Sequence, residues 1–367
     1  MSKLDELIAE LCPNGVEYKT LDKLCKTNRP PKKIPSKSIM DVGDYPVIDQ
    51  GAEFISGFTN DEHAILQKNE YIIFGDHTEN IKFVNFAFAQ GADGIKILTS
   101  VNCNCKYLYY SFSNNYVKTG KYSRHWSDAK STPIPVPPLP VQGEIVRILD
   151  NFMELISNLT EELQKRREQY RQYSTVLFDD AKKSGVYSIE EICHIEKGKT
   201  PIQKAVPGVY PMVVTTTERK SCDTFQFDAK AVCVPLVSSR GHGVASLNHV
   251  YYQEGKFALG NILCAIIPKN EEQVYPKYLY YYFEQTKDYT LVPLMKGGAN
   301  VSLHMNDIRK VKVPIPSLEE QKRIVDILSR FDTLCNDIST GLPAEIEARQ
   351  KQYEYYRDKL LTFEEKS

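Results

Sequence analysis

The sequence predicts an α+β protein made by internal duplication. It contains two similar globular units of mixed α and β structure, separated by a long antiparallel coiled-coil pair of helices and related by a pseudo-twofold repeat. The first observation behind this prediction is that residues 134–159 recur 179 positions later as residues 313–338. The second is the apolar spacing of three and four residues after each copy, which is typical of coiled-coil helices. The third is that each half of the 367-residue chain is long enough to form a domain.

The repeat is dense at the start of each long helix. A second block recurs 183 positions later, so the second copy has four additional residues, near 341–343. Residues 106–112 (KYLYYSF) and 277–283 (KYLYYYF) are also related. The period is far longer than the roughly 20–50 residues of a solenoid repeat, so it indicates duplicated domains. The matched pairs are Pro135/Pro314, Pro137/Pro316, Leu139/Leu318, Gln142/Gln321, Ile145/Ile324, Val146/Val325, Ile148/Ile327, Leu149/Leu328, Phe152/Phe331, Leu155/Leu334, Gln169/Gln352, Tyr170/Tyr353, Tyr173/Tyr356 and Leu177/Leu360.

Residues 1–12 predict an amphipathic, acidic helix without the cationic start of a secretory signal. The chain has no apolar run near the roughly 18 residues that a membrane span requires. We therefore expect a cytoplasmic protein without a membrane partner. The nine cysteines are scattered, and the close pair Cys103 and Cys105 lacks the second pair of a structural zinc site, so free thiols and no metal are expected.

Residues 13–133 and 185–312 are expected to form the globular units. Strands are predicted at 71–74, 81–89 and 95–98, and again at 210–215, 232–237 and 262–267, from runs of apolar and aromatic residues. Glycine-containing turns are predicted at 90–94, 239–243 and 296–300. The two KYLYY segments predict short amphipathic helices that pack on the sheets.

Each globular unit is followed by a predicted long helix that begins after a proline-rich segment. About 36 residues of helix would span roughly 54 Å. Arg166 and Arg349 interrupt the two seams at equivalent places, and Pro343 after Gly341 is expected to kink or restart the second helix. Packing of both helices inside the core of a single domain remains an alternative. The seam residues are Ile145, Leu149, Phe152, Ile156, Leu159, Leu163, Tyr170, Tyr173 and Leu177 in the first helix, and Ile324, Leu328, Phe331, Cys335, Ile338, Leu342, Ile346, Tyr353, Tyr356, Leu360 and Phe363 in the second.

These observations divide the chain into four segments. Residues 1–138 form the first globular domain with its N-terminal helix, and 139–184 form the central spacer helix. Residues 185–316 form the second globular domain, and 317–367 form the C-terminal spacer helix.

Charge is distributed unevenly along a chain whose net charge is only -1. The globular segments 13–138 and 185–316 carry +2 and +3, whereas the helical segments 139–184 and 317–367 carry -1 and -3. Mildly basic units and acidic helices suit a protein whose units contact an anionic polymer, although a chance imbalance would look the same.

Polar loops recur at corresponding places in both units, and their residue types are those that grip phosphates and read base edges. For any single residue, an ordinary solvated loop position is the alternative. The candidate DNA-binding residues are Arg29, Lys32, Lys33, Gln50, His77, Lys118, Lys121, Arg124, His125 and Trp126 in the first unit, and Lys197, Lys199, Thr200, Thr216, Arg219, Lys220, Ser239, Arg240, His242, Asn300, Ser302 and His304 in the second.

Motifs of catalysis and cofactor binding are missing from the sequence. Residues 197–200 (KGKT) end like a phosphate-binding loop, but Cys193 stands where that loop requires its first glycine. Asp128-Ala-Lys130 and Asp228-Ala-Lys230 lack a partner acid for a nuclease site, and no Asn/Asp-Pro-Pro-Tyr/Phe segment of an amino-methyltransferase occurs. No Rossmann, nucleophile-elbow or zinc-protease motif occurs either. We expect no catalytic residue, cofactor or metal in this chain.

The chain resembles the specificity (S) subunits of type I restriction-modification systems over its full length, most specifically at the starts of the two long helices. The resemblance rests on Ile134-Pro-Val-Pro-Pro-Leu139 with Gln142, on Val313-Pro-Ile-Pro-Ser-Leu318 with Gln321, and on residues 342–349, 352–363 and 11–18. Val141 and Gly143 depart from the family pattern around Gln142, and residues 164–173 lack its full Tyr-Tyr-Arg run.

The resemblance implies a non-catalytic subunit that reads a bipartite, asymmetric target in double-stranded DNA. The two globular domains would be target-recognition domains, and the helices would set the gap between the half-sites. Two modification (methyltransferase) subunits, which use S-adenosylmethionine to methylate an adenine, and the restriction subunits would dock on the helices and on residues 1–12. Two other classes stay open: a coiled-coil adaptor whose units bind peptide, and an enzyme with an unrecognised hydrolytic site.

Overall fold

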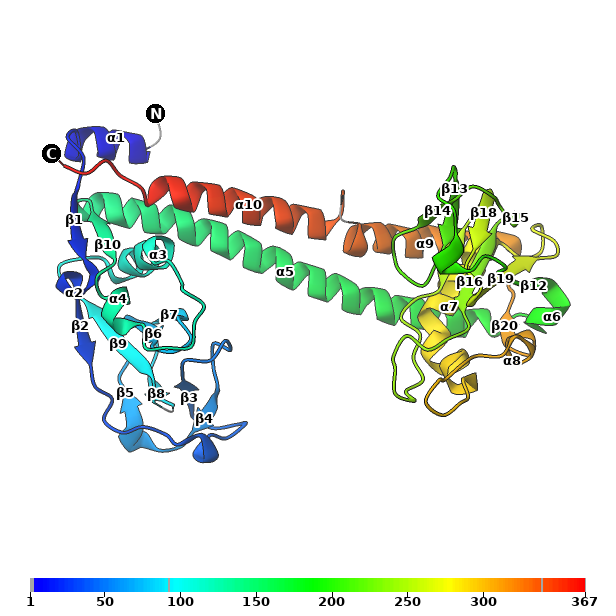
Figure 1. The fold of residues 1–367 in the computed structure, drawn as a ribbon, viewed down its shortest axis with the longest axis horizontal. Coiled ribbons are helices and arrows are strands. Elements are labelled where there is room, and N and C mark those ends of the chain that lie inside the picture. Colours follow the sequence, from blue (N-terminus) through cyan, green and yellow to red (C-terminus); the bar gives the residue numbers. More distant parts are fainter. Residues whose placement is uncertain (1–2, 92, 338, 367) are drawn as a thin grey trace. The chain divides into compact units, whose positions relative to one another are not determined.

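The computed structural model describes residues 3–91, 93–337 and 339–366, which fall into two compact units (Figure 1). Unit 1 comprises Met1–Asn158 and Ile346–Ser367, and unit 2 comprises Leu159–Glu345. The predicted seam residue Ile338, Ala92 of a predicted turn, and Met1 and Ser2 of the predicted first helix lie outside the described residues.

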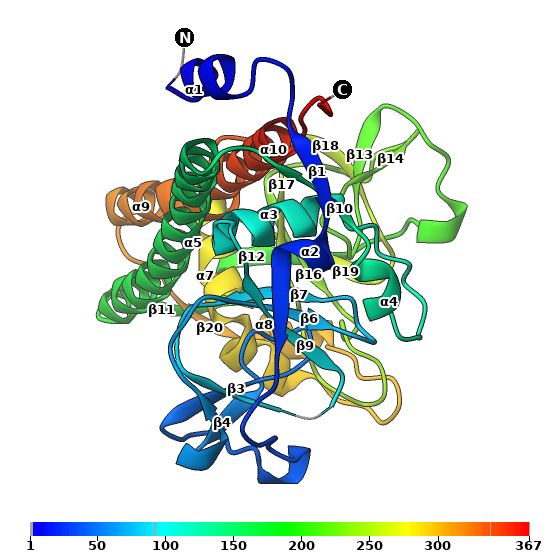
Figure 2. The same ribbon diagram turned by 90° about the vertical axis from the view of Figure 1, so that its left-hand side faces the viewer.

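Unit 1 contains two four-stranded sheets, ordered β2-β9-β6-β7 and β4-β3-β8-β5, and a two-stranded ribbon, β1-β10. Short helices connect the strands, and Figure 2 shows α3 lying over the sheet that contains β6 and β9. The elements are β1 Glu17–Thr20, α2 Leu21–Leu24, β2 Cys25–Asn28, η1 Ser36–Ser38, β3 Tyr45–Ile48, β4 Gly57–Thr59, η2 Glu62–Ala64, β5 Ile65–Leu66, β6 Tyr71–Gly75, β7 Ile81–Val84, β8 Phe88–Gln90, β9 Ile95–Ser100, α3 Cys105–Asn115, α4 Trp126–Ala129 and β10 Pro133–Val136.

Unit 2 repeats this topology strand for strand, with sheets β12-β19-β16-β17 and β14-β13-β18-β15 and the ribbon β11-β20. Each strand of unit 1 therefore has an equivalent whose number is higher by ten. The elements are β11 Val186–Ser188, α6 Ile189–Ile192, β12 Cys193–Lys197, η3 Ile202–Lys204, β13 Tyr210–Val213, β14 Lys220–Cys222, β15 Phe227–Asp228, β16 Ala231–Pro235, β17 Tyr251–Gln253, β18 Lys256–Leu259, β19 Leu263–Pro268, α7 Pro276–Thr290, η4 Val292–Leu294, α8 Met305–Arg309 and β20 Lys312–Pro314.

The strand register confirms the duplication. β3 and β8 pair in parallel through Val47 and Ala89, and β13 and β18 pair in parallel through Met212 and Ala258. One predicted strand was wrong: residues 81–89 form two strands, β7 and β8, which pair in different sheets. The change of sheet falls at Asn85, Phe86 and Ala87, and because two of these three residues are apolar, the apolar run continues across the break and conceals it.

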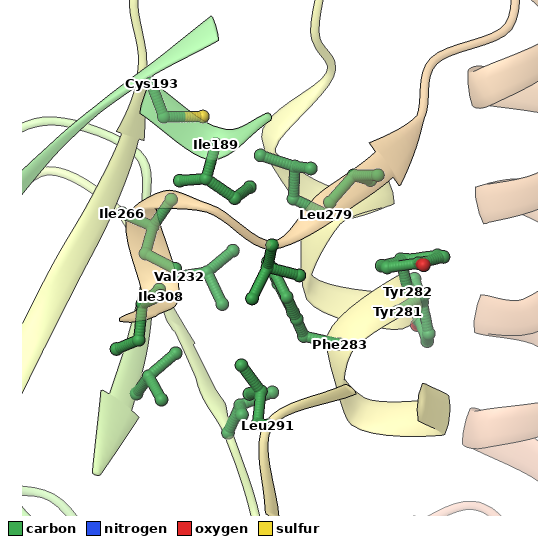
Figure 3. Packing of buried hydrophobic residues seen from close by; sticks show 14 of the residues in the cluster. Ile189, Cys193, Val232, Ile266, Leu279, Tyr281, Tyr282, Phe283, Leu291 and Ile308 are labelled. Carbon is green, nitrogen blue, oxygen red and sulfur yellow. The ribbon is translucent and has the colours of Figure 1, made fainter. Parts of the chain in front are cut away.

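The KYLYY segments form α3 and α7, which pack on the sheets as predicted. Figure 3 shows Leu279 and Phe283 of α7 facing the side chains of Val232 and Ile266, while Tyr281 and Tyr282 lie on the other side of the helix. The hydroxyl of Tyr278 donates to the carbonyl of Pro314 at 2.9 Å. Tyr107 makes the equivalent bond to Pro135, also at 2.9 Å. Each tyrosine thereby ties the helix on its sheet to the proline-rich strand before a long helix.

The repeated glutamines have a structural role. Gln142 is 1 % exposed, donates its amide to Pro137 O at 2.7 Å and accepts from Asn104 N at 2.8 Å. Gln321 is fully buried, donates to Pro316 O at 2.8 Å and accepts from Tyr275 N at 2.8 Å. In each unit one buried amide thus joins the start of the long helix to the start of the helix on the sheet.

The predicted antiparallel helix pairs are confirmed within each unit. The long helix α5 (Leu139–Ala181) begins in unit 1 and ends in unit 2, and α9 (Leu318–Asn336) and α10 (Leu342–Leu360) replace the second predicted helix. In unit 2, Arg167 donates to Cys335 O at 3.3 Å, whereas Tyr170, further along α5, contacts the earlier residue Phe331 of α9. In unit 1, Phe152 stacks on Tyr356 with ring centroids 5.5 Å apart.

The restart of the second helix follows from Gly341 and Pro343, as predicted. α10 begins at Leu342, and proline at a second helical position loses no intrahelical hydrogen bond. A side chain at Gly341 would place its Cβ 2.5 Å from Thr333 O, so only glycine fits there. The equivalent arginines of the seams also pair alike, Arg166 with Gln169 and Arg349 with Gln352, at 2.9 and 2.8 Å.

The N-terminal helix α1 (Lys3–Leu11) packs in unit 1 through the buried Leu4. Val16 N donates to Glu364 O and Lys366 N donates to Val16 O, both at 2.9 Å, so the two ends of the described chain lie side by side in this unit (Figure 1). Among the described residues, no helix combines the length and apolar character needed to cross a membrane.

Candidate nucleic-acid interface

Unit 1 contains a polar cleft at one edge of the sheet β2-β9-β6-β7. The end of β2 and the end of β6 both pair with the start of β9, through Asn28 with Ile97 and Gly75 with Ile95. The loops that follow these strands therefore meet. Together they form a cleft of about 790 Å³, which we call the unit 1 cleft. It is lined by residues 27–33, Asp76, His77, Gln90, residues 93–96 and Arg124.

Five of the ten predicted residues of unit 1 line this cleft: Arg29, Lys32, Lys33, His77 and Arg124. Lys32 pairs with Asp61 at 2.6 Å, and Lys33 pairs with Asp93. The hydrogen bonds from these lysines hold the pKa values of Asp61 and Asp93 below their usual range.

Within the part of the chain that the structure describes, Arg29 and Arg124 have no acidic partner within 4.0 Å. Both are exposed. Their charges are therefore available to an anionic ligand, whereas those of the two lysines are locally compensated.

Residues 116–126, which we call the 116–126 segment, contribute Arg124 to the lining of the cleft. His77 stacks on Tyr122 with ring centroids 5.3 Å apart, and its Nδ1 lies 3.1 Å from Ser123 O. Tyr122 is 89 % exposed. The predicted residues Lys118 and Lys121 are exposed on this segment outside the cleft lining. An aromatic face beside Arg124 suits stacking or groove contacts with nucleic acid.

Three predicted contacts of unit 1 instead support its interior. Gln50 accepts from His77 N at 3.2 Å and donates to Asp93 O at 3.4 Å, so its amide joins two cleft loops. His125 is only 2 % exposed, and Nε2 faces Lys121 O at 2.7 Å. Trp126 is half-buried and packs against Phe74 with centroids 5.9 Å apart. In this structure these three side chains hold the loops that carry the exposed residues.

Unit 2 has a smaller cleft of about 400 Å³ at the equivalent edge, which we call the unit 2 cleft. It is lined by Lys197, residues 236–237, residues 261–262 and residues 302–306. Lys197 at the end of β12 occupies the place of Arg29, since Cys193 and Cys25 begin equivalent strands with equivalent pairing. Three predicted residues, Lys197, Ser302 and His304, meet here.

The other predicted residues of unit 2 lie outside this cleft. Lys199 pairs with Glu196 at 2.9 Å, which contributes to a lowered pKa of Glu196, and Thr200 N donates to Leu259 O. Arg219 packs over Tyr251 and donates to Gln253 at 3.2 Å. The remaining residues are exposed on neighbouring loops or strands: Thr216, Lys220, Ser239, Arg240, His242 and Asn300.

The KGKT segment is explained by close backbone packing. A Cβ at Gly198 would lie 2.1 Å from Gly260 O, and Asn261 N donates to Thr200 O at 2.9 Å. Glycine is therefore needed where β12 leaves the sheet, and this packing accounts for the motif without a bound phosphate.

Sequence reasoning missed several cleft residues: Asn28, Asp76, Asp93 and Lys96 in unit 1, and Asn261 and Asn306 in unit 2. Three of them share a signal: Asn28 ends β2, Asp76 follows the end of β6, and Lys96 lies near the start of β9, which pairs with both strands. Strand order, which a single sequence does not display, is needed to use it. Among the described residues, no group of three or more histidine, cysteine or acidic side chains is placed to hold a metal ion.

Comparisons with known proteins agree with the duplicated fold. The family model of the type I restriction modification DNA specificity domain matches twice, at residues 13–166 and 181–348. The Escherichia coli type I restriction enzyme EcoR124I/EcoR124II specificity subunit is 32% identical over 99% of this chain and 97% of its own length. The crystal structure of a type I restriction-modification system S subunit from M. genitalium has the same fold, with a TM-score of 0.62, 17% identity, and coverage of 95% of this chain and 96% of that one.

Proposed function

Because the chain belongs to the type I restriction-modification DNA specificity family, we propose that each of its units reads one half of a bipartite, asymmetric DNA target. In this proposal residues 1–138 and 185–316 are the target-recognition domains, and 139–184 and 317–367 are the spacer helices. The chain acts without catalysis of its own. Modification and restriction subunits supply the methyl transfer and the cleavage.

The observation that carries the proposal is the pair of clefts at equivalent sheet edges. Both are built from the ends of equivalent strands and from the segment that precedes α4 or α8. Both present a cation at the same position, Arg29 or Lys197. Their other linings differ, so two copies of one frame present two different chemical surfaces, as an asymmetric two-part target requires.

Basic and amide side chains dominate the exposed polar positions of the clefts. The guanidinium group of Arg124 suits the paired hydrogen-bond acceptors of guanine. The side-chain amides of Asn261 and Asn306 suit the neighbouring donor and acceptor of adenine. Lys118 and Lys121 lie outside the cleft lining on the same exposed segment, where contacts to the phosphate backbone would fix the orientation of the duplex.

The experiment is to co-express the chain with the modification subunit of the same system and to map methylated adenines by single-molecule sequencing. A two-part motif with a fixed gap is expected. Arg29→Ala and Lys197→Ala should each weaken binding of a duplex that carries the motif and lower the slope of log affinity against log salt by about 1.

Lys68→Ala is the matched control, because Lys68 is exposed in unit 1 just before β6, whereas the cleft lies at the end of that strand. A stable complex that methylates nothing would favour the peptide-binding adaptor. A continuous motif without a gap would contradict the division of reading between the two units.

A further inference from the structure

We infer that Glu79 is a positioning residue for DNA recognition in unit 1, because it holds the 116–126 segment in the form that presents Arg124 at the cleft. The inference rests on the proposed function, since it concerns how one of the two reading surfaces is kept in shape. Glu79 does not line the cleft and would not contact DNA.

The carboxylate of Glu79 accepts from four donors on three residues of the segment, Tyr116, Thr119 and Gly120. Oε1 accepts from the hydroxyl of Tyr116 at 2.7 Å and from Thr119 N at 2.8 Å. Oε2 accepts from Gly120 N at 2.8 Å and from the hydroxyl of Thr119 at 3.3 Å. The segment has no helix or strand between α3 and α4, so these bonds replace the main-chain pairing that would otherwise fix it.

Glu79 is placed for this task by the turn after β6. Its φ is 56°, a left-handed conformation that is uncommon for residues other than glycine, and its N–H donates to Gly75 O at 2.9 Å. Gly75 is the last residue of β6, whose pairing with β9 forms the cleft edge. The carboxylate is therefore rigidly connected to the sheet from which the cleft is built.

His125 extends the same network toward Arg124. Its Nδ1 lies 3.5 Å from Glu79 Oε1, and its Nε2 lies 2.7 Å from Lys121 O and 3.1 Å from the hydroxyl of Ser123. Arg124 lies between Ser123 and His125, which are both held, while its own side chain is exposed. Its position at the cleft thus depends on a network that begins at Glu79.

The charge of Glu79 is maintained despite burial. The residue is 2 % exposed, and burial alone would raise its pKa, but the bonds from Thr119 N, Tyr116 and Gly120 N, together with the charge of His125, lower the pKa to about 2. Buried charges are costly, and apolar packing commonly stabilises a core as well. A carboxylate that satisfies four donors specifies one geometry of a loop, which apolar packing does less well.

Unit 2 fixes its equivalent segment by other means. Position 239, at the same distance beyond β16, is an exposed serine, and residues Met295, Val301 and Leu303 of that segment are buried. The positioning device therefore belongs to one half-site only. Loss of Glu79 should change the reading of one half of the motif and leave the other half unchanged.

The test uses the full chain with its modification subunit and a duplex that carries the motif found for the wild type. Glu79→Gln keeps the shape but directs an amide donor at backbone donors. We expect about a tenfold loss of affinity, comparable with Arg124→Ala. In the Arg124→Ala background the same change should cost less than about twofold, because coupled positions are not additive. Methylation mapping should show relaxed sequence preference in one half only.

Glu144→Gln is the matched control, because Glu144 is another buried carboxylate of unit 1, bound to Arg147 and Lys3 on the helices. It should lower stability and leave the motif unchanged. If Glu79→Gln does not fold, Tyr116→Phe serves as the second variant, because it removes one hydrogen bond to Glu79 and keeps the ring. It should show the same dependence on Arg124, with about a threefold loss of affinity.

Equal losses from Glu79→Gln with and without Arg124 would overturn the inference, as would wild-type affinity of Glu79→Gln when Arg124→Ala binds weakly. So would an unchanged affinity of Arg124→Ala. The failure of the proposed function gives a different result, since the wild type would then methylate no two-part motif.

Discussion

The segments before α4 and α8 hold equivalent positions in the two units but expose alternate side chains. In unit 1, Arg124 is exposed and His125 is 2 % exposed. In unit 2, the equivalent of Arg124 is Leu303, which is 2 % exposed, and the equivalent of His125 is His304, which is exposed. The same stretch of backbone thus presents an arginine at one cleft and a histidine at the other.

A shift of one residue in backbone pairing explains the exchange. Leu303 N donates to Leu236 O at 2.9 Å, whereas in unit 1 it is His125 N, one position later, that donates to Asp76 O at 2.9 Å. His125 has ψ of -9° and His304 has ψ of 135°. Along an extended chain, a shift by one residue turns each side chain to the opposite face.

Asp76 stabilises the shifted form. Its carboxylate accepts from His125 N at 3.1 Å and Trp126 N at 2.8 Å, so it caps the short helix α4. Leu236 stands at the equivalent place in unit 2 and has no side-chain acceptor. The comparison teaches that the duplicated frame can be kept, with its buried glutamines and tyrosines, while one buried acid changes which residue faces the ligand.

The largest expected difference between the units is in their response to acid. The buried carboxylates among the described residues, Asp76, Glu79 and Glu144, all belong to unit 1. The pKa of Glu79 is lowered to about 2 as described above. The hydrogen bond from Arg147 lowers the pKa of Glu144, and burial raises it. With the further hydrogen bond from Lys3, the pKa is lowered to about 2 as well.

Stabilisation by a carboxylate with a lowered pKa is complete above its ordinary value and is lost as pH falls toward the folded value. Unit 1 should therefore lose up to about 3 kcal/mol per carboxylate between about pH 4.5 and 2. Trp126, the only tryptophan of the chain, lies in unit 1, so its fluorescence should report this loss before hydrogen exchange reports opening of α7. Glu79→Gln should flatten the pH dependence of the stability of unit 1. A simultaneous loss of stability in both units would show that the buried carboxylates of unit 1 do not govern the response to acid.

The next largest effect is expected at the exchanged position itself. Leu303→Ala removes a buried side chain and should lower the free energy of unfolding by about 2–4 kcal/mol. Arg124→Ala should change stability by less than about 0.5 kcal/mol, because the side chain is exposed and unpaired by acids. Chemical denaturation measures both. A similar decrease in the free energy of unfolding for both variants would show that Arg124 supports the fold as Leu303 does.

The sequence predicted the duplication, the helix starts and the restart near Pro343 because these depend on local signals. Proline, glycine and apolar spacing act through neighbouring residues. The exchange at Arg124 and Leu303 was not predictable in this way, since it depends on Asp76, which is distant in sequence. For the same reason His125 and His304, which lie 179 positions apart like the repeated helix starts, were both predicted to bind DNA, and the structure buries only His125.

The smallest expected effect concerns the compensated charges of the unit 1 cleft. Lys33 pairs with Asp93, and both are exposed, so the pair itself contributes little to stability. The opposite charges of the pair cancel, so it neither attracts nor repels a DNA backbone. The double variant Lys33→Ala with Asp93→Ala should therefore change affinity by less than about 0.5 kcal/mol and leave the salt slope as it is.

Lys197 of unit 2 provides the contrast. In the described ranges it has no acidic partner within 4.0 Å, since Glu196 pairs with Lys199. Lys197→Ala should lower the salt slope by about 1, and Lys33→Ala alone should weaken binding because it leaves Asp93 as an uncompensated negative charge at the cleft. Titration of a labelled duplex at several salt concentrations separates these cases. If the double variant bound as weakly as Lys33→Ala, Lys33 would have to contact DNA in spite of Asp93, and the division between compensated lysines and available arginines would not describe how this cleft attracts its ligand.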